Sequence, residues 1–306
     1  MSRRIRRTIP ALRFASAGMT RVVSGETTGD PMVAGLLSGK RALVMGVAND
    51  HSIAWGVAKA LSQAGAEIAF TYQGEALGKR VRPLAASLGS DIVLPCDVED
   101  LASVGAVFDA LKERWGELDI LVHAIGFSNK NELKGRYADT TRENFSRTMV
   151  ISAFSFTELA KRAAEIMPAG GSMLTMTYGG ATRVMPNYNV MGVAKAALEA
   201  SVRYLAADYG PQGIRVNAIS AGPVRTLAGA GIADARLMYD FQRRHSPLRR
   251  PVTIEDVGGA ALYLLSPLSA GVTGEIHFVD AGYNIISMPN PAALKTIDAA
   301  EAKAED

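Results

Sequence analysis

A tyrosine and a lysine stand seven residues apart in the second half of the chain. Tyr188 and Lys195 are separated by two helical turns, so their side chains would lie on nearly the same face of a helix. A tyrosine hydroxyl ordinarily titrates near pH 10, and a neighbouring ammonium would favour its ionised form. Together the two groups could hydrogen-bond a carbonyl oxygen that becomes negative when a hydride arrives. An aromatic core residue beside a surface lysine is the plainer alternative for any single pair of this kind.

A glycine loop follows the first strand-length apolar run and could receive phosphate groups. Its glycines, Gly46 and Gly56, are ten residues apart, so the loop is not a GxGxxG fingerprint. A glycine directly after a strand nevertheless permits a tight turn, and the next helix would offer free backbone NH groups and a positive dipole end to a pyrophosphate. Alone this is weak evidence, because ordinary strand-to-helix loops share these features.

The second strand-length run is followed by Gln73, at the position that bears on coenzyme choice. A strict NAD site would carry Asp or Glu there, to bind the 2′-hydroxyl of the adenosine ribose. Glutamine can also hydrogen-bond a hydroxyl, and no Arg or Lys stands immediately beside Gln73 to neutralise a 2′-phosphate. If this is a dinucleotide site, the sequence favours NADH over NADPH.

Seven strand-length apolar runs, each bounded by Gly, Asp or Pro, alternate with amphipathic stretches. The predicted strands are Arg41–Met45, Glu67–Tyr72, Asp91–Leu94, Ile120–Ile125, Ser172–Thr177, Arg215–Ser220 and Glu275–Val279, and the predicted helices include Ser52–Ala64, Leu101–Trp115, Thr141–Met167 and Asn189–Tyr209. A capping-box pattern, Thr140-x-x-Glu143, opens the third helix. The alternation predicts an α/β protein with a single-domain Rossmann fold, whose doubly wound parallel sheet of about seven strands carries helices on both faces. Such a sheet binds ligands beyond the carboxyl ends of its strands, where the candidate residues stand.

The composition of the 306-residue chain is that of a globular protein, with 48% hydrophobic and 21% charged residues. This excludes a mainly disordered or collagen-like chain. The single cysteine, Cys96, cannot form an internal disulfide, and the four histidines lack metal-ligand spacing, so no metal site is expected. No apolar run reaches the roughly 18 residues that span a bilayer, so no membrane span is expected.

The net charge of +3 originates in the N-terminal segment. Residues 1–31 hold six arginines and two acids, whereas the rest of the chain holds 27 basic and 28 acidic side chains. Two interpretations of this basic extension are open: an organellar transit peptide, or a dispensable leader read from an early start codon. Nucleic-acid binding is the weaker alternative. Residues 289–306 are rich in Ala, Lys and acids, and we expect a flexible tail there.

Over about residues 36–288, the chain resembles the short-chain dehydrogenase/reductase superfamily and, within it, the bacterial-type enoyl-[acyl-carrier-protein] reductases of type II fatty acid synthesis. The resemblance rests on Gly46-x5-Ser52-Ile53-x2-Gly56, on Pro186-Asn-Tyr-Asn-Val-Met-Gly, on Tyr188-x6-Lys195 and on Arg215-Val-Asn-Ala-Ile-Ser-Ala-Gly-Pro-Val-Arg-Thr-Leu-Ala228. Keto-reductases of the superfamily carry Tyr-x3-Lys, whereas Gly192 stands four residues after Tyr188. The resemblance therefore implies reduction of a carbon–carbon double bond.

The resemblance also implies a role for each matching residue. At the adenosine half of the coenzyme, the pyrophosphate would be received by Gly46, Ser52 and Ile53, the adenosine end by Gln73, and the adenine by Asp97 and Val98. The ribose region would contact Ile125 and Gly126, and Lys195 would hold the nicotinamide ribose. The nicotinamide and phosphates would be covered by Val224, Arg225, Thr226, Leu227 and Ala228. On the substrate side, Tyr188 would donate a hydrogen bond to the thioester oxygen, and Tyr178, Phe127, Ser128 and Met191 would line the acyl pocket. Gly179-Gly180, where a larger residue is common in the family, would widen that pocket.

The implied activity is NADH-dependent reduction of trans-2-enoyl-[acyl-carrier-protein] thioesters to saturated acyl thioesters in fatty acid elongation. The partners would be acyl carrier protein bearing the enoyl chain and further copies of this chain in a homotetramer. The enzyme would be cytoplasmic, or organellar if residues 1–31 are a transit peptide. The expected domain covers residues 32–288, with a substrate lid at about 222–244. Two alternatives are a keto- or hydroxy-group reductase of the same superfamily and a non-catalytic NAD(H)-binding regulator, which would be expected to lack Tyr188 or Lys195.

Overall fold

The computed structural model describes residue 33, residues 35–226 and residues 235–288. The basic extension at 1–31, the tail at 289–306 and residues 227–234 of the expected lid lie outside the described residues. Within the described residues, no helix combines the length and the hydropathy needed to cross a membrane. The same part of the chain contains no group of three or more His, Cys, Asp or Glu side chains that could hold a metal ion.

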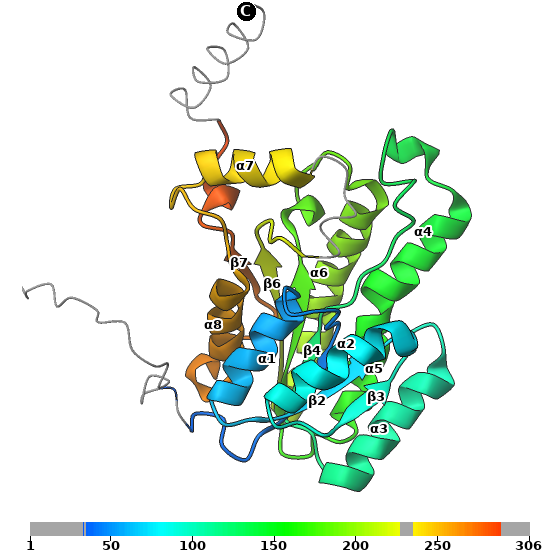
Figure 1. The fold of residues 1–306 in the computed structure, drawn as a ribbon, viewed down its shortest axis with the longest axis vertical. Coiled ribbons are helices and arrows are strands. Elements are labelled where there is room, and N and C mark those ends of the chain that lie inside the picture. Colours follow the sequence, from blue (N-terminus) through cyan, green and yellow to red (C-terminus); the bar gives the residue numbers. More distant parts are fainter. Residues whose placement is uncertain (1–32, 34, 227–234, 289–306) are drawn as a thin grey trace, which may run out of the picture.

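One sheet of seven parallel strands forms the centre of the fold (Figure 1). The strands are β1 (Arg41–Met45), β2 (Glu67–Tyr72), β3 (Val93–Pro95), β4 (Ile120–His123), β5 (Gly171–Thr177), β6 (Ile214–Ala221) and β7 (Ile276–Val279). They lie in the order β3-β2-β1-β4-β5-β6-β7. The strand order reverses at β1, where Leu43 pairs with Ala69 of β2 on one side and with Leu121 of β4 on the other. The predicted doubly wound parallel sheet is confirmed.

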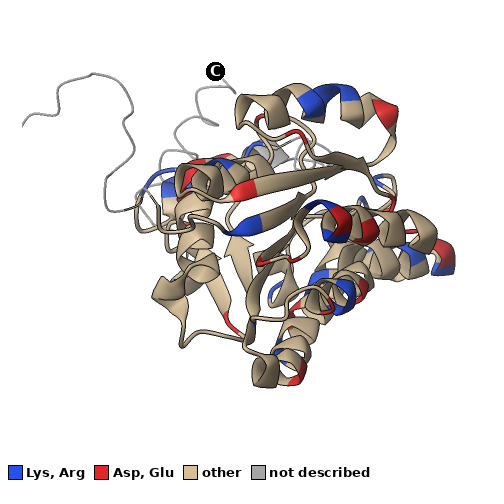
Figure 2. Cartoon of the chain, turned by 90° about the horizontal axis from the view of Figure 1, so that it is seen from below, with Lys and Arg blue, Asp and Glu red and all other residues tan. Residues whose placement is uncertain are grey.

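Helices cover both faces of the sheet, which explains why the strands are continuous apolar runs. The helices are α1 (Ile53–Gln63), α2 (Gly74–Ser87), α3 (Leu101–Trp115), α4 (Arg142–Met149), α5 (Ser155–Ala164), α6 (Asn189–Tyr209), α7 (Ala235–His245) and α8 (Ile254–Leu265). Ala42 and Val44 of β1 belong to the core shared with α1, α2 and α8. Leu43 and Met45 belong to the core shared with α3, α5 and α6. Charged residues gather on the outer helices and leave most of the strands uncharged (Figure 2).

The first and the last of the sheet-covering helices, α1 and α8, cross at a pair of glycines. A Cβ on Gly56 of α1 would lie 2.3 Å from the backbone oxygen of Ile254, and a Cβ on Gly258 of α8 would lie 2.6 Å from the backbone oxygen of Gly56. Neither position can accept a side chain unless one helix moves. Gly56, which the sequence placed in the phosphate-binding motif, therefore serves helix packing in this structure.

Several details of the predicted elements are wrong. Strand β4 ends at His123, two residues earlier than predicted, and the predicted helix 141–167 is interrupted by a π-helical turn, η2 (Val150–Phe154). The cap of α4 is Thr141 rather than Thr140: its Oγ1 accepts a hydrogen bond from the backbone N of Asn144 at 3.2 Å. The partner carboxylate is Glu132 rather than Glu143, because a Glu132 oxygen accepts from the backbone N of Thr141 at 2.9 Å.

Candidate active site

Two tyrosines meet at the carboxyl end of β5. Tyr178 directly follows this strand, and Tyr188 stands immediately before α6, where it is 7% exposed. Their ring centroids are 5.0 Å apart and the rings stand edge to face at 71°, an arrangement that aromatic pairs favour. The predicted site thus brings both tyrosines to the same point of the sheet edge.

Small residues allow this approach. The short 3-10 helix η3 (Gly179–Ala181) follows Tyr178, and a Cβ on Gly180 would lie only 2.4 Å from Cδ1 of the Tyr188 ring. A Cβ on Gly192 of α6 would lie 2.8 Å from the backbone oxygen of Gly180. The ring of Tyr188 occupies the space beside Gly180, whereas Gly179 lines a pocket beside Tyr178, so the expected widening by Gly179-Gly180 stays a prediction for Gly179.

Lys195 is a buried residue of α6. It is 7% exposed, and its Nζ donates a hydrogen bond of 2.8 Å to the backbone oxygen of Met176, near the end of β5. Burial lowers the pKa of the Lys195 ammonium to about 8, and the nearby carboxylate of Glu199 partly offsets this. Because an ammonium has three donors, Lys195 retains hydrogen-bonding capacity for a ligand.

Burial has the opposite effect on the tyrosines, because their charged form is an anion. It raises the pKa of Tyr178 to about 12. It raises the pKa of Tyr188 further, and Tyr178 adds to that rise. The expectation that the ammonium of Lys195 favours an ionised Tyr188 is therefore wrong: near neutral pH, Tyr188 is a protonated hydroxyl that can donate a hydrogen bond.

The loop between β1 and α1 is built around Gly46 and Ser52. Gly46 has a φ of +101°, and a Cβ there would lie 2.1 Å from the backbone oxygen of Ala124, so only glycine fits. The Oγ of Ser52 accepts hydrogen bonds from the backbone N atoms of Ala48 and Asn49 at 3.0 and 3.1 Å. Ser52 thereby shapes the loop from within, and Ile53 begins α1 beside it.

Gln73 and Asp97, which were expected near the adenosine, lie together just beyond the carboxyl ends of β2 and β3. The Nε2 of Gln73 donates a hydrogen bond of 3.0 Å to Oδ2 of Asp97, and Val98 is buried next to them. An arginine that was not predicted also lies at this end: Arg82 of α2 donates a hydrogen bond of 2.7 Å to the hydroxyl of Tyr72. This guanidinium is held by Glu75, at 2.8 and 3.0 Å.

The segment after β4 closes the other side of the site. A Cβ on Gly126, which follows Ile125, would lie 3.8 Å from Nζ of Lys195 and 3.5 Å from Cε of Met191. Ser152, which sequence analysis did not single out, fixes this segment: its Oγ accepts from the backbone N of Phe127 and donates to the backbone oxygen of Phe127, both at 2.9 Å.

The remaining residues of the predicted site contact groups other than the two tyrosines. Ser128 Oγ lies within hydrogen-bond distance of the side chain of Asn144. Val224 packs against the core, and the guanidinium of Arg225 lies 4.4 Å from the centroid of the Tyr239 ring of α7. Of the other predicted nicotinamide contacts, Thr226 donates its backbone N to Val224 at 2.8 Å, whereas Leu227 and Ala228 lie outside the described residues.

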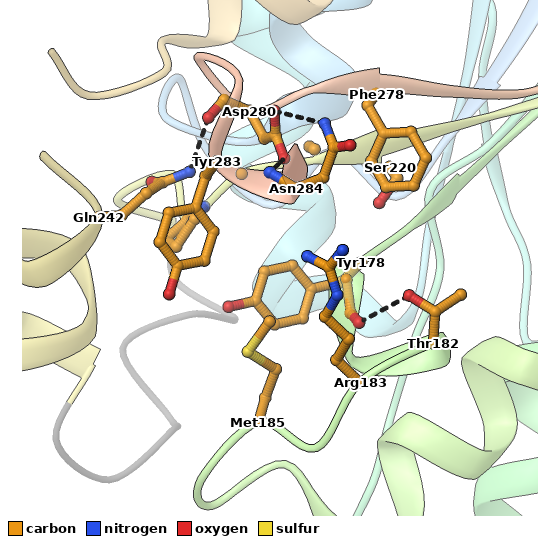
Figure 3. A pocket seen from close by; sticks show the side chains of 14 residues that line it. Tyr178, Thr182, Arg183, Met185, Ser220, Gln242, Phe278, Asp280, Tyr283 and Asn284 are labelled. Carbon is orange, nitrogen blue, oxygen red and sulfur yellow. Dashed lines mark hydrogen bonds between the residues drawn. The ribbon is translucent and has the colours of Figure 1, made fainter. Parts of the chain in front are cut away.

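A small pocket of about 40 Å³ opens beside Tyr178, between η3 and the end of β7. Figure 3 shows Tyr178, Met185 and Tyr283 around this pocket, with Gln242 of α7 hydrogen-bonded to Asp280 at its wall. The pocket is lined both by aromatic rings and the thioether of Met185 and by polar side chains such as Gln242. It adjoins Tyr178, one of the two tyrosines.

Two further groups of the site carry no recognisable motif. His123, the last residue of β4, is buried between the hydroxyls of Thr175 at 2.8 Å and Ser155 at 3.0 Å. Glu199, one turn after Lys195 on α6, is also buried. The four-residue spacing from Lys195 was the signal that could have indicated Glu199, while nothing in the sequence distinguishes His123 from a core residue.

Comparison with known proteins gives one consistent result. The family described as enoyl-(acyl carrier protein) reductase matches residues 46–284. Enoyl-[acyl-carrier-protein] reductase [NADH] 2 of Rhizobium meliloti is 77% identical over 265 residues, which is 87% of this chain and 99% of that protein.

Solved structures agree. The crystal structure of FabI from Candidatus Liberibacter asiaticus superimposes with a TM-score of 0.83 at 60% identity, covering 84% of this chain and all of that one. The reductase of Anaplasma phagocytophilum in complex with NAD gives 0.82 at 57% identity, covering 84% and 98% of the two chains. With its parallel sheet, its paired tyrosines and its buried lysine, this chain belongs to the enoyl-(acyl carrier protein) reductase family.

Proposed function

We propose that this chain catalyses the NADH-dependent reduction of trans-2-enoyl-[acyl-carrier-protein] thioesters to saturated acyl thioesters. The observation that carries the proposal is the site at the end of β5, where a protonated Tyr188 adjoins Tyr178 and precedes the buried ammonium of Lys195 by two helical turns. The 77% identity to a reductase named for NADH supports the same activity.

The residues present fit a nicotinamide dinucleotide. Gly46 and Ser52 shape a loop that ends at the N-terminus of α1, where free NH groups suit a pyrophosphate. Gln73 can donate to or accept from a ribose hydroxyl, and Asp97 holds its amide in place. The binding roles of Val98, Ile125 and residues 224–228 are part of the proposal.

The adenosine end also supports NADH rather than NADPH. Arg82 is the cation near Gln73, and the carboxylate of Glu75 already pairs with it. That pairing lowers the pKa of Glu75 to about 2, so Glu75 stays negative across the physiological range. A 2′-phosphate here would meet this negative charge. Parallel titrations with NADH and NADPH test the inference, and tighter binding of NADPH would contradict it.

The bound coenzyme supplies the hydride that the β-carbon of the substrate receives. Addition of the hydride moves negative charge to the thioester oxygen, and a hydrogen bond aimed at that oxygen stabilises it where it develops. Addition of a proton at the α-carbon then restores the thioester carbonyl and gives the saturated chain. Tyr188 provides this donor because burial keeps its hydroxyl protonated. Lys195 holds the ribose hydroxyls through the donors that Met176 does not use. Tyr178 lines the pocket described above, and we propose that Phe127, Ser128 and Met191 contact the acyl chain as well.

An assay with two substrates tests the proposed function. Oxidation of NADH is followed with crotonyl thioester and with acetoacetyl thioester, on the full chain and on a chain starting at Met32. Turnover of the enoyl substrate alone supports the proposal. Turnover of the keto substrate alone would instead support a keto-reductase, and binding of NADH without any turnover would support a regulator. Equal activity of the two chains would agree with a dispensable leader.

The assembly, the protein partner, the domain organisation and the location of this chain are proposed as follows. We propose a homotetramer, because Val150 and Phe154 of η2 and Tyr204 of α6 expose large apolar side chains. We also propose acyl carrier protein as the partner, one domain at 32–288 with a lid at 222–244, and a cytoplasmic location unless residues 1–31 act as a transit peptide. Light scattering after gel filtration tests the tetramer, and a monomer would contradict it.

A further inference from the structure

A buried carboxyl group lies one helical turn beyond Lys195 and has no part in the mechanism above. Glu199 is 7% exposed, as buried as Lys195 itself. Burial raises the pKa of Glu199, which shows that the protein interior opposes its negative charge. A buried carboxylate is costly unless a partner offsets the loss of water. Its presence beside the site lysine therefore calls for a physical reason.

The end of β5 holds both charged side chains. Oγ1 of Thr177 donates a hydrogen bond of 2.8 Å to Oε1 of Glu199. The backbone oxygen of the preceding residue, Met176, accepts from Nζ of Lys195 at 2.8 Å. Two consecutive strand residues thus fix the carboxylate and the ammonium relative to each other, and Tyr178 follows them directly.

The other titratable groups around Lys195 come from β4, from the residue after β5 and from the residue before α6, and they are neutral near pH 7. Burial, followed by the charge of Lys195, lowers the pKa of His123 to about 3. Tyr178 and Tyr188 remain protonated, as described above. On α6, Arg203 acts on Glu199 from the exposed side and favours its ionised form. Among the described residues, Glu199 is thus the anion whose charge raises the pKa of Lys195, against the lowering that burial causes.

We propose that Glu199 is a positioning residue that acts as the counter-ion of Lys195 and keeps this lysine in its ammonium form where NADH binds. The inference rests on the proposed function, because it assigns NADH to the Lys195 site. It separates two roles on one helix: Lys195 contacts the coenzyme, while Glu199 acts only through Lys195. Removing the charge of Glu199 should therefore alter the pH dependence of NADH binding more than the fold.

The test is NADH binding without substrate, measured by fluorescence titration from pH 6 to pH 9. Glu199→Gln keeps the shape of the side chain and an oxygen for Thr177 but removes the charge. An opposite charge nearby shifts a pKa by about one unit or more. A shift of about one unit down from about 8 would make the dissociation constant about fivefold higher at pH 8 and leave it nearly unchanged at pH 6.

Two control variants separate charge from structure. Thr177→Val breaks the hydrogen bond but keeps the carboxylate, and Asp208→Asn removes an exposed charge from the same helix. Both should keep the wild-type midpoint. Glu199→Asp, which keeps the charge on a shorter side chain, should give a midpoint between those of wild type and Glu199→Gln. Urea unfolding of each variant reports the fold.

Several outcomes would overturn the inference. One is a Glu199→Gln midpoint equal to that of wild type, and another is an affinity loss that is the same at pH 6 and pH 8. A shift in Thr177→Val as large as that in Glu199→Gln would show that the hydrogen bond, and not the charge, matters. A wild-type protein that binds no NADH at pH 6 would overturn the proposed function, and this inference with it.

Discussion

Replacing Gly180 by alanine tests whether the position of the Tyr188 ring controls the reaction. The new Cβ would lie 2.4 Å from Cδ1 and 2.8 Å from Cε1 of that ring. Ordinary contacts begin near 3.4 Å, so the ring must retreat by about 1 Å. A displacement of this size at a reacting group costs about 10²-fold in rate, which corresponds to about 2.7 kcal/mol in the activation free energy.

The neighbouring glycine provides a matched control. A Cβ on Gly179 would lie 3.3 Å from Cε of Met185, the far end of a flexible side chain that can move aside. NADH oxidation with crotonyl thioester should therefore show kcat/KM about 10²-fold lower for Gly180→Ala and within about threefold of wild type for Gly179→Ala. NADH affinity should change little in either, because Lys195 is held by β5. Equal activity of the two variants would refute this reasoning.

Four further predictions follow from the same structure. Tyr188→Phe should lower kcat about 10²-fold while keeping NADH affinity, as measured by stopped-flow turnover. Lys195→Ala should weaken NADH binding about tenfold, as measured by NADH titration. If neither kcat nor NADH affinity changed, the site assignment would be contradicted. Gly258→Ala places a Cβ 2.6 Å from the oxygen of Gly56 and should lower the free energy of unfolding by about 1–3 kcal/mol, measured in urea, where an unchanged midpoint would argue against the tight crossing. His123 has a pKa of about 3 when folded and 6.5 as its ordinary value, so its contribution to stability is complete above pH 6.5 and is lost as the pH falls toward 3, with a slope of up to about 1.4 kcal/mol per pH unit. His123→Gln should flatten this dependence in urea unfolding at pH 7, 5 and 4, and identical slopes would contradict the burial of a neutral imidazole.

The sequence predicted the strands well because both faces of this sheet are buried. β1 and β2 have the predicted bounds, and the other strands differ by one or two residues at one or both ends. Gln73 and Asp97, which the resemblance assigned to the adenosine end, meet because they follow the carboxyl ends of the neighbouring parallel strands β2 and β3. Periodicity was sufficient for the strands, whereas the contact between these two side chains was not predicted.

Features that depend on distant contacts could not be predicted. The cap of α4 moved to Thr141 because Glu132, from the preceding loop, accepts its backbone NH. Gly56 matched a phosphate-binding motif, but its partner is a helix about 200 residues away in the sequence. The state of Tyr188 was predicted from one neighbouring charge, whereas its burial decides the pKa.

The crossing of α1 and α8 also has a consequence for how this chain is made on the ribosome. The helix that covers β1 is translated early, but the helix that packs on it, at residues 254–265, emerges about 200 residues later. At about 5–20 residues per second, this interval is roughly 10–40 s. Throughout that time the nascent chain presents the unpartnered side of α1, which includes Gly56, to solvent or to a chaperone. The final compaction of the domain must therefore wait until nearly all of it has been synthesised.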